Sequence, residues 1–276
     1  MNPDELKTRV ADYWNREACG TGAASAPKYS REYFDQIEAH RYEVEPEIFA
    51  FAQFTRHCGQ KVLEVGVGAA TDFLQWVRAG AKAYGVDLTE AAIEHAKRRL
   101  DVYGLRAEEV RVADAENLPY PDEFFDLVYS WGVIHHTPDT FKAFREIVRC
   151  TRVGGTIKVM IYNRHSLLAF QRYLAFGLAR FRPFARVSDI LFHHQESMGT
   201  KAFSRSEIVR FLATCPVQVR RTEAKATAYD LLWHKPWPCR AIAYALAACL
   251  GFHRCGWFMT IEAIKTGRPA ATVSGL

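Results

Sequence analysis

VLEVGVGAATD, residues 62–72, decides the fold expected for this chain. Its first four residues are apolar apart from one carboxylate and predict a buried strand. Gly66 and Gly68 follow and allow a tight turn, because no Cβ stands in the way. Thr71 and Asp72 can then cap the start of a helix and leave backbone N–H groups facing outward. The stretch therefore predicts a strand, a ligand-binding turn and a helix.

A second strand is expected at AYGVD, residues 83–87, which ends in Asp87. About twenty residues separate this carboxylate from the glycine turn, a distance that suits a βαβ unit whose acid binds the two ribose hydroxyls. Leu88, the next residue, is assigned to the same site. These features predict a cofactor of the adenosine type.

The glycine spacing helps to choose among such cofactors. A dinucleotide fingerprint has the pattern G-x-G-x-x-G, and Thr71 stands at its third glycine position. Glu64 lies two residues before Gly66, where a pyrophosphate would meet a carboxylate. A cofactor that carries an ammonium group and no phosphate suits this turn better, so a nicotinamide oxidoreductase is disfavoured.

Glu64, Gly66 and Gly68 form the pattern E-x-G-x-G, and here the chain resembles the class I S-adenosylmethionine (SAM) dependent methyltransferases. VADAENLPYPDEFFDLVYSWGVIHHTPD, residues 112–139, is similar to the middle of the small-molecule branch of that family. The resemblance covers residues 61–163 and implies SAM as cofactor. It also implies an adenine contact from Asp114 and Ala115, and a lining of the methionine portion by Ser130, Trp131 and Gly132.

Strand and helix patterns alternate along the middle of the chain, which predicts an α/β fold with a Rossmann-like, doubly wound, mostly parallel sheet. The resemblance implies that the last strand is antiparallel and inserted between its neighbours. We expect three parts: an N-terminal helical cap over residues 1–60, the SAM-binding core over residues 61–163, and the C-terminal part of the core fold with substrate-side helical insertions over residues 164–276. Two boundaries inside the core are also predicted: a helix opened by Thr137 and Pro138, and a strand over residues 156–162 after a Gly154–Gly155 turn.

Composition limits the class of protein. The 276 residues are 49% hydrophobic and carry a formal net charge of +5, with the basic residues spread out. No dense basic face indicates a nucleic-acid partner. The longest apolar run, residues 241–251, is shorter than the roughly 20 residues of a spanning helix. The seven scattered cysteines, Cys19 in a glycine-rich loop among them, predict neither a zinc site nor a disulfide framework, and with no signal-peptide pattern at the N-terminus they favour a cytoplasmic protein.

His135 and His136 are the candidate catalytic residues, because they follow the SAM-contacting turn and histidine titrates near neutral pH. Either could take a proton from a hydroxyl, amine or thiol; the alternative is that the pair serves loop structure. The ubiquinone-biosynthesis O-methyltransferases resemble this segment but carry E-x-x-E-H. Gly132 and His135 stand here in place of the two carboxylates, so no metal is expected.

Candidate acceptor-binding residues come from three places. Aromatic residues of the cap could cover the methionine end, where an aromatic face favours a sulfonium; the end of the fifth strand faces the ligand crevice; and a histidine pair in the first insertion could reach the pocket, or form a solvent-facing turn. Arg41 could pair with the SAM carboxylate, with Glu38 or with Glu45. The acceptor-binding set is Tyr13, Trp14, Tyr29, Tyr33, Tyr162, Asn163 and His194.

The sequence thus predicts a SAM-dependent methyltransferase that acts on an oxygen, nitrogen or sulfur atom of a small molecule in an enclosed, aromatic-lined pocket. Two alternatives stay open: an enzyme for a lipid-like quinol at the membrane surface, since residues 180–182 and 233–237 are basic and aromatic, and a non-catalytic SAM-binding protein. An amino methylase of nucleic acid bases is disfavoured, because SWGVI replaces its N/D-P-P-Y turn. The oligomeric state is left open.

Overall fold

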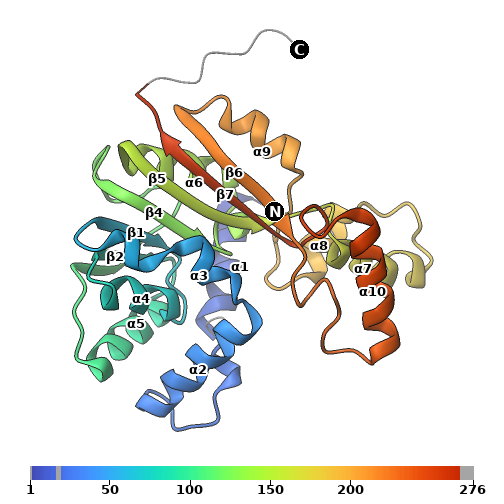
Figure 1. The fold of residues 1–276 in the computed structure, drawn as a ribbon, viewed down its shortest axis with the longest axis horizontal. Helices are drawn as coiled ribbons and strands as arrows, with labels where there is room; N and C mark the ends of the chain where they lie inside the picture. The colour runs from blue at the N-terminus through green and yellow to red at the C-terminus, as the bar shows by residue number, and fades with distance from the viewer. Residues whose placement is uncertain (1, 17–19, 268–276) are drawn as a thin grey trace.

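A seven-stranded sheet with the order β3-β2-β1-β4-β5-β7-β6 forms the centre of the protein (Figure 1). The computed structural model describes residues 2–16 and 20–267. Strands β1 to β5 are parallel, and β7 runs antiparallel to both β5 and β6. The predicted sheet, with its inserted antiparallel last strand, is confirmed. The strands are β1 Lys61–Val65, β2 Lys82–Asp87, β3 Glu109–Val112, β4 Phe125–Trp131, β5 Thr151–Tyr162, β6 Val217–Lys225 and β7 Phe258–Lys265.

Helices cover both faces of this sheet, as in a doubly wound fold. Helices α3, α4 and α5 pack on one face, and α6 and α9 on the other. None of the helices in the described part of the chain has the length and apolar character needed to cross a membrane. The helices are α1 Pro3–Arg16, α2 Arg31–Val44, α3 Glu47–Ala52, α4 Thr71–Arg78, α5 Glu90–Tyr103, α6 Thr140–Cys150, α7 Leu167–Phe176, α8 Val187–His194, α9 Arg205–Leu212 and α10 Trp237–Leu250.

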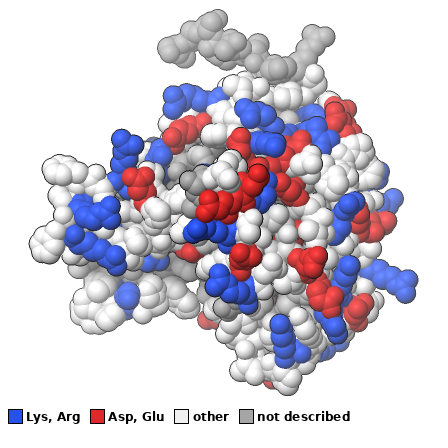
Figure 2. Space-filling model, turned by 180° about the vertical axis from the view of Figure 1, so that it is seen from behind, with Lys and Arg blue, Asp and Glu red and all other residues white. Residues whose placement is uncertain are grey.

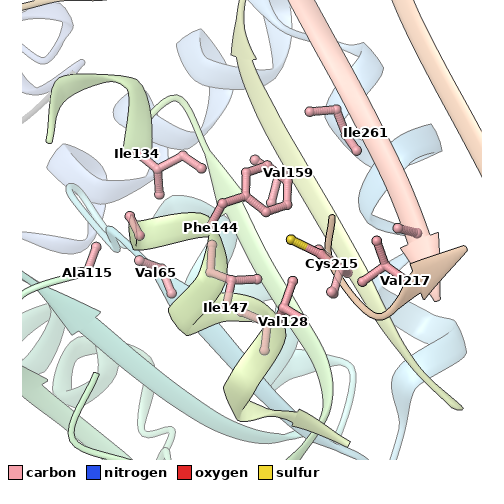
Figure 3. Close-up of a cluster of buried hydrophobic side chains, with 14 of the residues drawn as sticks. Val65, Ala115, Val128, Ile134, Phe144, Ile147, Val159, Cys215, Val217 and Ile261 are labelled. Carbon is pink, nitrogen blue, oxygen red and sulfur yellow. The ribbon is translucent and has the colours of Figure 1, made fainter. Parts of the chain in front are cut away.

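The two-residue period of each strand separates the two packed layers. Phe144 and Ile147 of α6 lie against Val128 and Val159 on one face of the sheet, and all four side chains are buried (Figure 3). On the opposite face, Glu64 lies under α4, where it meets the buried tryptophan of that helix. The charged residue of the motif is thus held inside the fold.

The end of the sheet where the site lies follows from the strand order. Strand β1 has β2 on one side and β4 on the other, so the strand order proceeds in opposite directions from β1. A crevice opens at the carboxyl ends of parallel strands at such a switch point. The turn after β1 and the segment after β4 meet there.

Two sequence-based helix starts are wrong. Helix α6 begins after Asp139, whose side chain accepts the N–H of Lys142 at 2.9 Å. The hydroxyl of Thr137, the predicted cap, instead donates to the carbonyl of Ile134 at 2.8 Å and closes a short turn. Helix α4 follows Ala70 in a left-handed conformation, with no side-chain cap.

The predicted start of the fifth strand is also wrong. Strand β5 begins at Thr151, so the two glycines that were expected to form a turn lie within it. Gly155 is extended there, and a Cβ on it would lie 2.8 Å from the carbonyl oxygen of Arg152. Gly154 and Gly155 allow a local irregularity in β5, at the point where its pairing register with β4 shifts.

Helices α7, α8 and α10, with the connecting residues 177–186 and 226–236 and the two residues after α8, Gln195 and Glu196, form a helical wing beside the core (right side of Figure 1). The wing corresponds to the two predicted insertions. Leu167 of α7 packs against Ala247 of α10, which holds the two insertions together. The division of the chain at residues 60 and 163 stays a prediction.

Candidate functional site

A cavity of about 500 Å³ opens at the carboxyl ends of β1, β2 and β4, within the size range of roughly 300–1,000 Å³ that small-molecule sites have. The cap, the core and the wing all contribute to its wall. Eleven of the predicted site residues line it: Trp14, Glu64, Gly66, Gly68, Asp87, Leu88, Asp114, Ala115, Trp131, His136 and Tyr162, joined by Gly132.

The two glycines of the turn have different roles. Gly66 has a φ of +85°, and a Cβ on it would lie 2.2 Å from a methyl carbon of Val133. Gly68, with a φ of +49°, has no atom within 4 Å of its would-be Cβ. Gly66 is therefore required by close packing, whereas Gly68 keeps open the cavity wall that a bound ligand would approach.

Asp87 is fixed at the end of β2 by three hydrogen bonds. Its Oδ2 accepts the N–H of Gly68 at 3.0 Å, and its Oδ1 accepts the N–H and the hydroxyl of Thr89 at 3.0 and 2.9 Å. Burial raises the pKa of Asp87, and the N–H donors partly offset this effect. A carboxylate has about four acceptor positions, so capacity remains for a ribose hydroxyl.

Asp114 follows β3 and is held by neighbours from the cap. Its Oδ2 accepts from the ammonium of Lys7 in α1 at 2.6 Å, and its Oδ1 accepts the N–H of Glu116 at 2.9 Å. Ala115 lies beside it in the cavity wall. Helix α1 thus reaches the predicted adenine position through a charged contact.

Three carboxylates gather with Arg41 at the other side of the turn. Arg41 lies 3.3 Å from both Glu45 and Asp72, so of the pairings proposed from sequence the one with Glu45 is observed. The indole of Trp131 donates to Glu45 at 2.6 Å, and the indole of Trp76 donates to Glu64 at 2.9 Å.

Burial raises the pKa of both Glu45 and Glu64, and Asp72 raises the pKa of Glu64 further. These acids therefore repel one another when ionised. A cation beside them would relieve that repulsion, and this suits a ligand with ammonium and sulfonium groups.

His136 lies in the cavity wall with acidic and hydroxyl neighbours. Its Nε2 is 3.4 Å from Oε2 of Glu196, and its Nδ1 contacts the hydroxyls of Ser197 and Thr200 at 2.9 and 3.1 Å. Tyr162 donates its hydroxyl to both carboxylate oxygens of Glu196, at 2.9 and 2.8 Å. Trp14 of α1 packs edge-on to the His136 ring, at 5.5 Å between centroids.

Glu196 has a φ of +52°, an uncommon backbone conformation for a residue with a side chain. Its side chain keeps 33% of its surface accessible and lines the cavity. Burial acts to raise its pKa, but His136 and the hydroxyl of Tyr162 outweigh burial and the pKa is lowered. The group is an anion at neutral pH.

Three predicted core residues lie behind the wall instead of in it. His135 is fully buried and packs against the Tyr162 ring, with 3.8 Å between ring centroids. Burial, followed by the charges of His136 and Lys201, lowers its pKa well below the ordinary value. Ser130 donates to the carbonyl of Val65 at 3.0 Å. Asn163 donates to the carbonyl of Gly256 at 2.9 Å. Their contacts support the loops around the cavity.

Four predicted acceptor-binding residues also lie away from the cavity wall. Tyr29 and Tyr33 pack with Phe34 in a small cluster of the cap, Tyr13 is 39% exposed, and His194 stacks on Phe176 at 4.3 Å. Cys19 lies outside the described residues. Among the residues that the structure describes, no group of three or more His, Cys, Asp or Glu side chains could hold a metal ion.

Sequence reasoning missed several residues of the wall: Glu45, Asp72, Arg172, Gln195, Glu196 and Tyr229. Asp72 stood within the deciding motif but was interpreted as a helix cap. The others come from the cap and the wing, whose sequences carry no local motif. The one sequence signal was that Glu196 lies two residues after the histidine pair of the first insertion, for which a solvent-facing turn was one of the two interpretations.

Comparison with known proteins decides the family of the core. The family model described as "Methyltransferase domain" matches residues 63–159. These residues form a methyltransferase domain. The domain includes most of β1, all of β2 and β4, and the turns after them, which line the cavity. The predicted resemblance to the class I SAM-dependent methyltransferases is confirmed.

Relatives of the methyltransferase domain include an uncharacterized protein of Mycobacterium tuberculosis, 34% identical over 45% of this chain and 44% of its own length. Another is phthiotriol/phenolphthiotriol dimycocerosates methyltransferase 1 of Mycobacterium ulcerans, 39% identical over 35% of each chain. The matches thus span less than half the length of these curated relatives.

A solved structure extends the likeness of the fold beyond the methyltransferase domain. Geranyl diphosphate C-methyltransferase of Streptomyces coelicolor, in complex with Mg²⁺, geranyl diphosphate and S-adenosyl-L-homocysteine, superposes with a TM-score of 0.63. The superposition covers 95% of this chain and 98% of that one, at 19% identity. The cap and the wing therefore belong to an architecture that a known methyltransferase shares.

Proposed function

We propose that the protein transfers the methyl group of SAM to an oxygen, nitrogen or sulfur atom of a small molecule. One observation carries the proposal: the motif residues Glu64, Gly68 and Asp87 line the same cavity of about 500 Å³ as His136. When bound, SAM supplies an electrophilic methyl group on a positively charged sulfur. A methyl acceptor in the same cavity would lie between that donor and a residue able to take its proton.

The donor-side residues divide the work of binding. Asp87 would hold the ribose, and Asp114 with Ala115 the adenine. Glu45, Glu64 and Asp72 would face the cationic end of the donor, where their mutual repulsion is relieved. The lining by Trp131 and Tyr162 limits water near the reacting atoms.

On the acceptor side, His136 would accept the proton that an alcohol, thiol or protonated amine must lose. Glu196 would hold the imidazole in place and stabilise its protonated form, and Tyr162 would fix Glu196. His135, buried behind this group, would support the loop. Apolar acceptors without a phosphate group suit the aromatic wall best. The lipid-type substrate in the name of the M. ulcerans relative agrees with this preference.

Two measurements test the proposal. Titration calorimetry with SAM, S-adenosylhomocysteine and NAD should show binding of the first two and none of NAD. A screen of thiols, phenols, amines and quinols with a methyl-labelled donor should then identify an acceptor. Binding of NAD without SAM would refute the methyltransferase assignment, whereas SAM binding without turnover across the screen would favour the non-catalytic alternative.

A further inference from the structure

Helix α10 is apolar and yet mostly exposed. Its fourteen residues include one charged side chain, Arg240, and only Ala243 and Ala247 among them are buried. A helix that is hydrophobic on all sides is normally covered by protein or lipid. The large apolar side chains left accessible on it are Trp237 at 75%, Ile242 at 63%, Tyr244 at 59%, Leu246 at 42% and Leu250 at 56%.

The other insertion of the wing shows the same character at its tip, residues 177–186. Phe181 and Phe184 are 95% and 97% exposed, more than any other large apolar side chain the structure describes. Phe170 and Leu174 of α7, at 51% and 40%, add further exposed apolar side chains to the wing. Solvent-exposed apolar surface of this extent marks an interaction site.

The charge of the wing is strongly one-sided. Residues 167–196 and 226–250 of the wing contain five arginines, one lysine and three acids. Of these acids, Glu196 lines the cavity and Asp230 is buried, which leaves Asp189 exposed. The whole chain, in contrast, is nearly balanced, with 36 basic and 31 acidic residues. In Figure 2 the wing, at the left, is largely white with blue groups, whereas red groups concentrate over the remainder of the molecule.

We propose that this wing binds the surface of an anionic phospholipid bilayer. Exposed Phe and Trp side chains insert at the level of the headgroups, while arginines and lysines beside them pair with lipid phosphates. The charge argues for lipid over a second copy of the chain, because two such wings facing each other would bring like charges together. Helix α10 is shorter than the roughly 20 residues needed to cross a bilayer, so it would lie along the surface.

This binding requires neither methyl donor nor acceptor, so vesicle flotation of the full chain tests it alone. We expect at least about tenfold more protein on phosphatidylcholine vesicles that contain about 30% phosphatidylglycerol than on pure phosphatidylcholine vesicles. The double variant Phe181→Ser, Phe184→Ser should lose most of that binding. Its side chains contact little of the fold, so its melting temperature should equal that of the wild type.

A matched control replaces two exposed valines outside the wing, Val153 and Val209, which are 45% and 44% accessible, by serine; its vesicle binding should be unchanged. A charge variant, Arg182→Ser with Arg186→Ser, should lose the preference for anionic vesicles. The proposal is overturned if the wild type ignores both vesicle types, or if the phenylalanine variant floats like the wild type. The proposal would also be overturned if sedimentation showed that the wild type is a dimer and the phenylalanine variant a monomer, because a second copy would then cover the wing.

Discussion

The carboxylate of Glu196 lies 3.4 Å from Nε2 of His136, on a backbone turn that belongs to the wing, whereas His136 follows the core strand β4. Tyr162, at the end of β5, donates its hydroxyl to both oxygens of that carboxylate. Three separate parts of the chain thus build one polar group at the cavity. The contact with His136 and the hydroxyl of Tyr162 lowers the pKa of Glu196, so this carboxylate places a negative charge beside the proposed base.

We expect His136→Asn to lower kcat by about 10²–10⁴-fold, the range found when a general base is removed. Glu196→Gln should lower kcat less and shift the acidic limb of the kcat/KM profile to lower pH. The sign follows from the charge of Glu196, whose pKa is lowered by His136: the neutral amide of glutamine removes a negative charge beside the proposed base, so the limb moves to lower pH. Initial rates with the labelled donor, measured between pH 5 and 9 with an acceptor from the screen, check both expectations.

His135→Asn is the control for this prediction, because His135 is next to His136 but buried behind the wall. The acidic limb should keep its position in this variant even where stability falls. Full turnover by His136→Asn at every pH would eliminate the proposed base, and an unshifted limb in Glu196→Gln would eliminate the coupling to Glu196.

The two glycines of the donor turn should respond differently to alanine. In Gly66→Ala the new methyl group would meet Val133 within 2.2 Å, so we expect overpacking to cost about 1–3 kcal/mol and the left-handed backbone about 1–2 kcal/mol more. Gly68→Ala meets open space and should lose only the backbone contribution. Its methyl group enters the cavity, however, and should weaken S-adenosylhomocysteine binding by about tenfold or more.

Urea unfolding and calorimetry measure these two effects separately. Gly104→Ala serves as the control, since Gly104 also has a left-handed φ of +64° and open space around its Cβ position but lies at the end of α5. It should match Gly68→Ala in stability and bind ligand like the wild type. Equal affinity of Gly68→Ala and the control would show that the ligand does not approach this turn.

The core of the fold could be predicted because its signals are local. Apolar runs, turn glycines and a carboxylate at a strand end lie within a few residues of one another, and all of them describe strands whose ends meet at one edge. Helix starts were less predictable where a side chain had a competing partner. The hydroxyl of Thr137 bonds to Ile134, and this contact could not be distinguished from a cap by sequence.

The acceptor side could be predicted only in part, because its residues are brought together by long-range packing. Trp14 and Tyr162 line the cavity as expected, but Tyr29 and Tyr33 pack against His95 where the cap meets α5. Glu196 lies 60 residues from His136 in sequence, and no spacing rule connects the two. Their contact depends on where the wing docks, which a single sequence does not specify.

His95 should make the protein sensitive to acid. It is buried in the cap interface beside Tyr33, and burial, with the charges of Arg99 and Lys28, lowers its pKa to about 4. The unfolded chain therefore binds a proton near pH 6.5 that the folded chain binds only near pH 4, and stability falls as the pH falls through this window. The full effect is about 3 kcal/mol, at roughly 1.4 kcal/mol for each pKa unit.

Urea unfolding at pH 7 and pH 4.5 measures this sensitivity. In His95→Gln the loss of stability between the two pH values should be smaller than in the wild type by a few kcal/mol. His193→Gln, which replaces an exposed histidine, should behave like the wild type. A loss of the same size in His95→Gln and in the wild type would assign the acid sensitivity to other groups.

Arg99 connects the cap to the donor turn and should affect both stability and binding. Its guanidinium is fully buried and donates to the carbonyl of Ala69 at 3.0 Å and the hydroxyl of Thr71 at 2.9 Å on the turn. The same group donates to Glu38 of α2 at 2.9 Å. In Arg99→Met these acceptors lose a buried donor, so we expect a loss of about 3 kcal/mol in the free energy of unfolding.

The turn that Arg99 holds also carries the proposed donor site, so the affinity of Arg99→Met for S-adenosylhomocysteine should fall by about tenfold under conditions where circular dichroism shows it folded. Arg98→Met is the matched control, because Arg98 is the next residue, is 57% exposed and pairs only with Glu94 among the acids the structure describes near it. An exposed pair of this kind adds little to stability, so the control should unfold and bind like the wild type. If Arg99→Met lost stability but kept its affinity, the cap would stabilise the fold without shaping the donor turn.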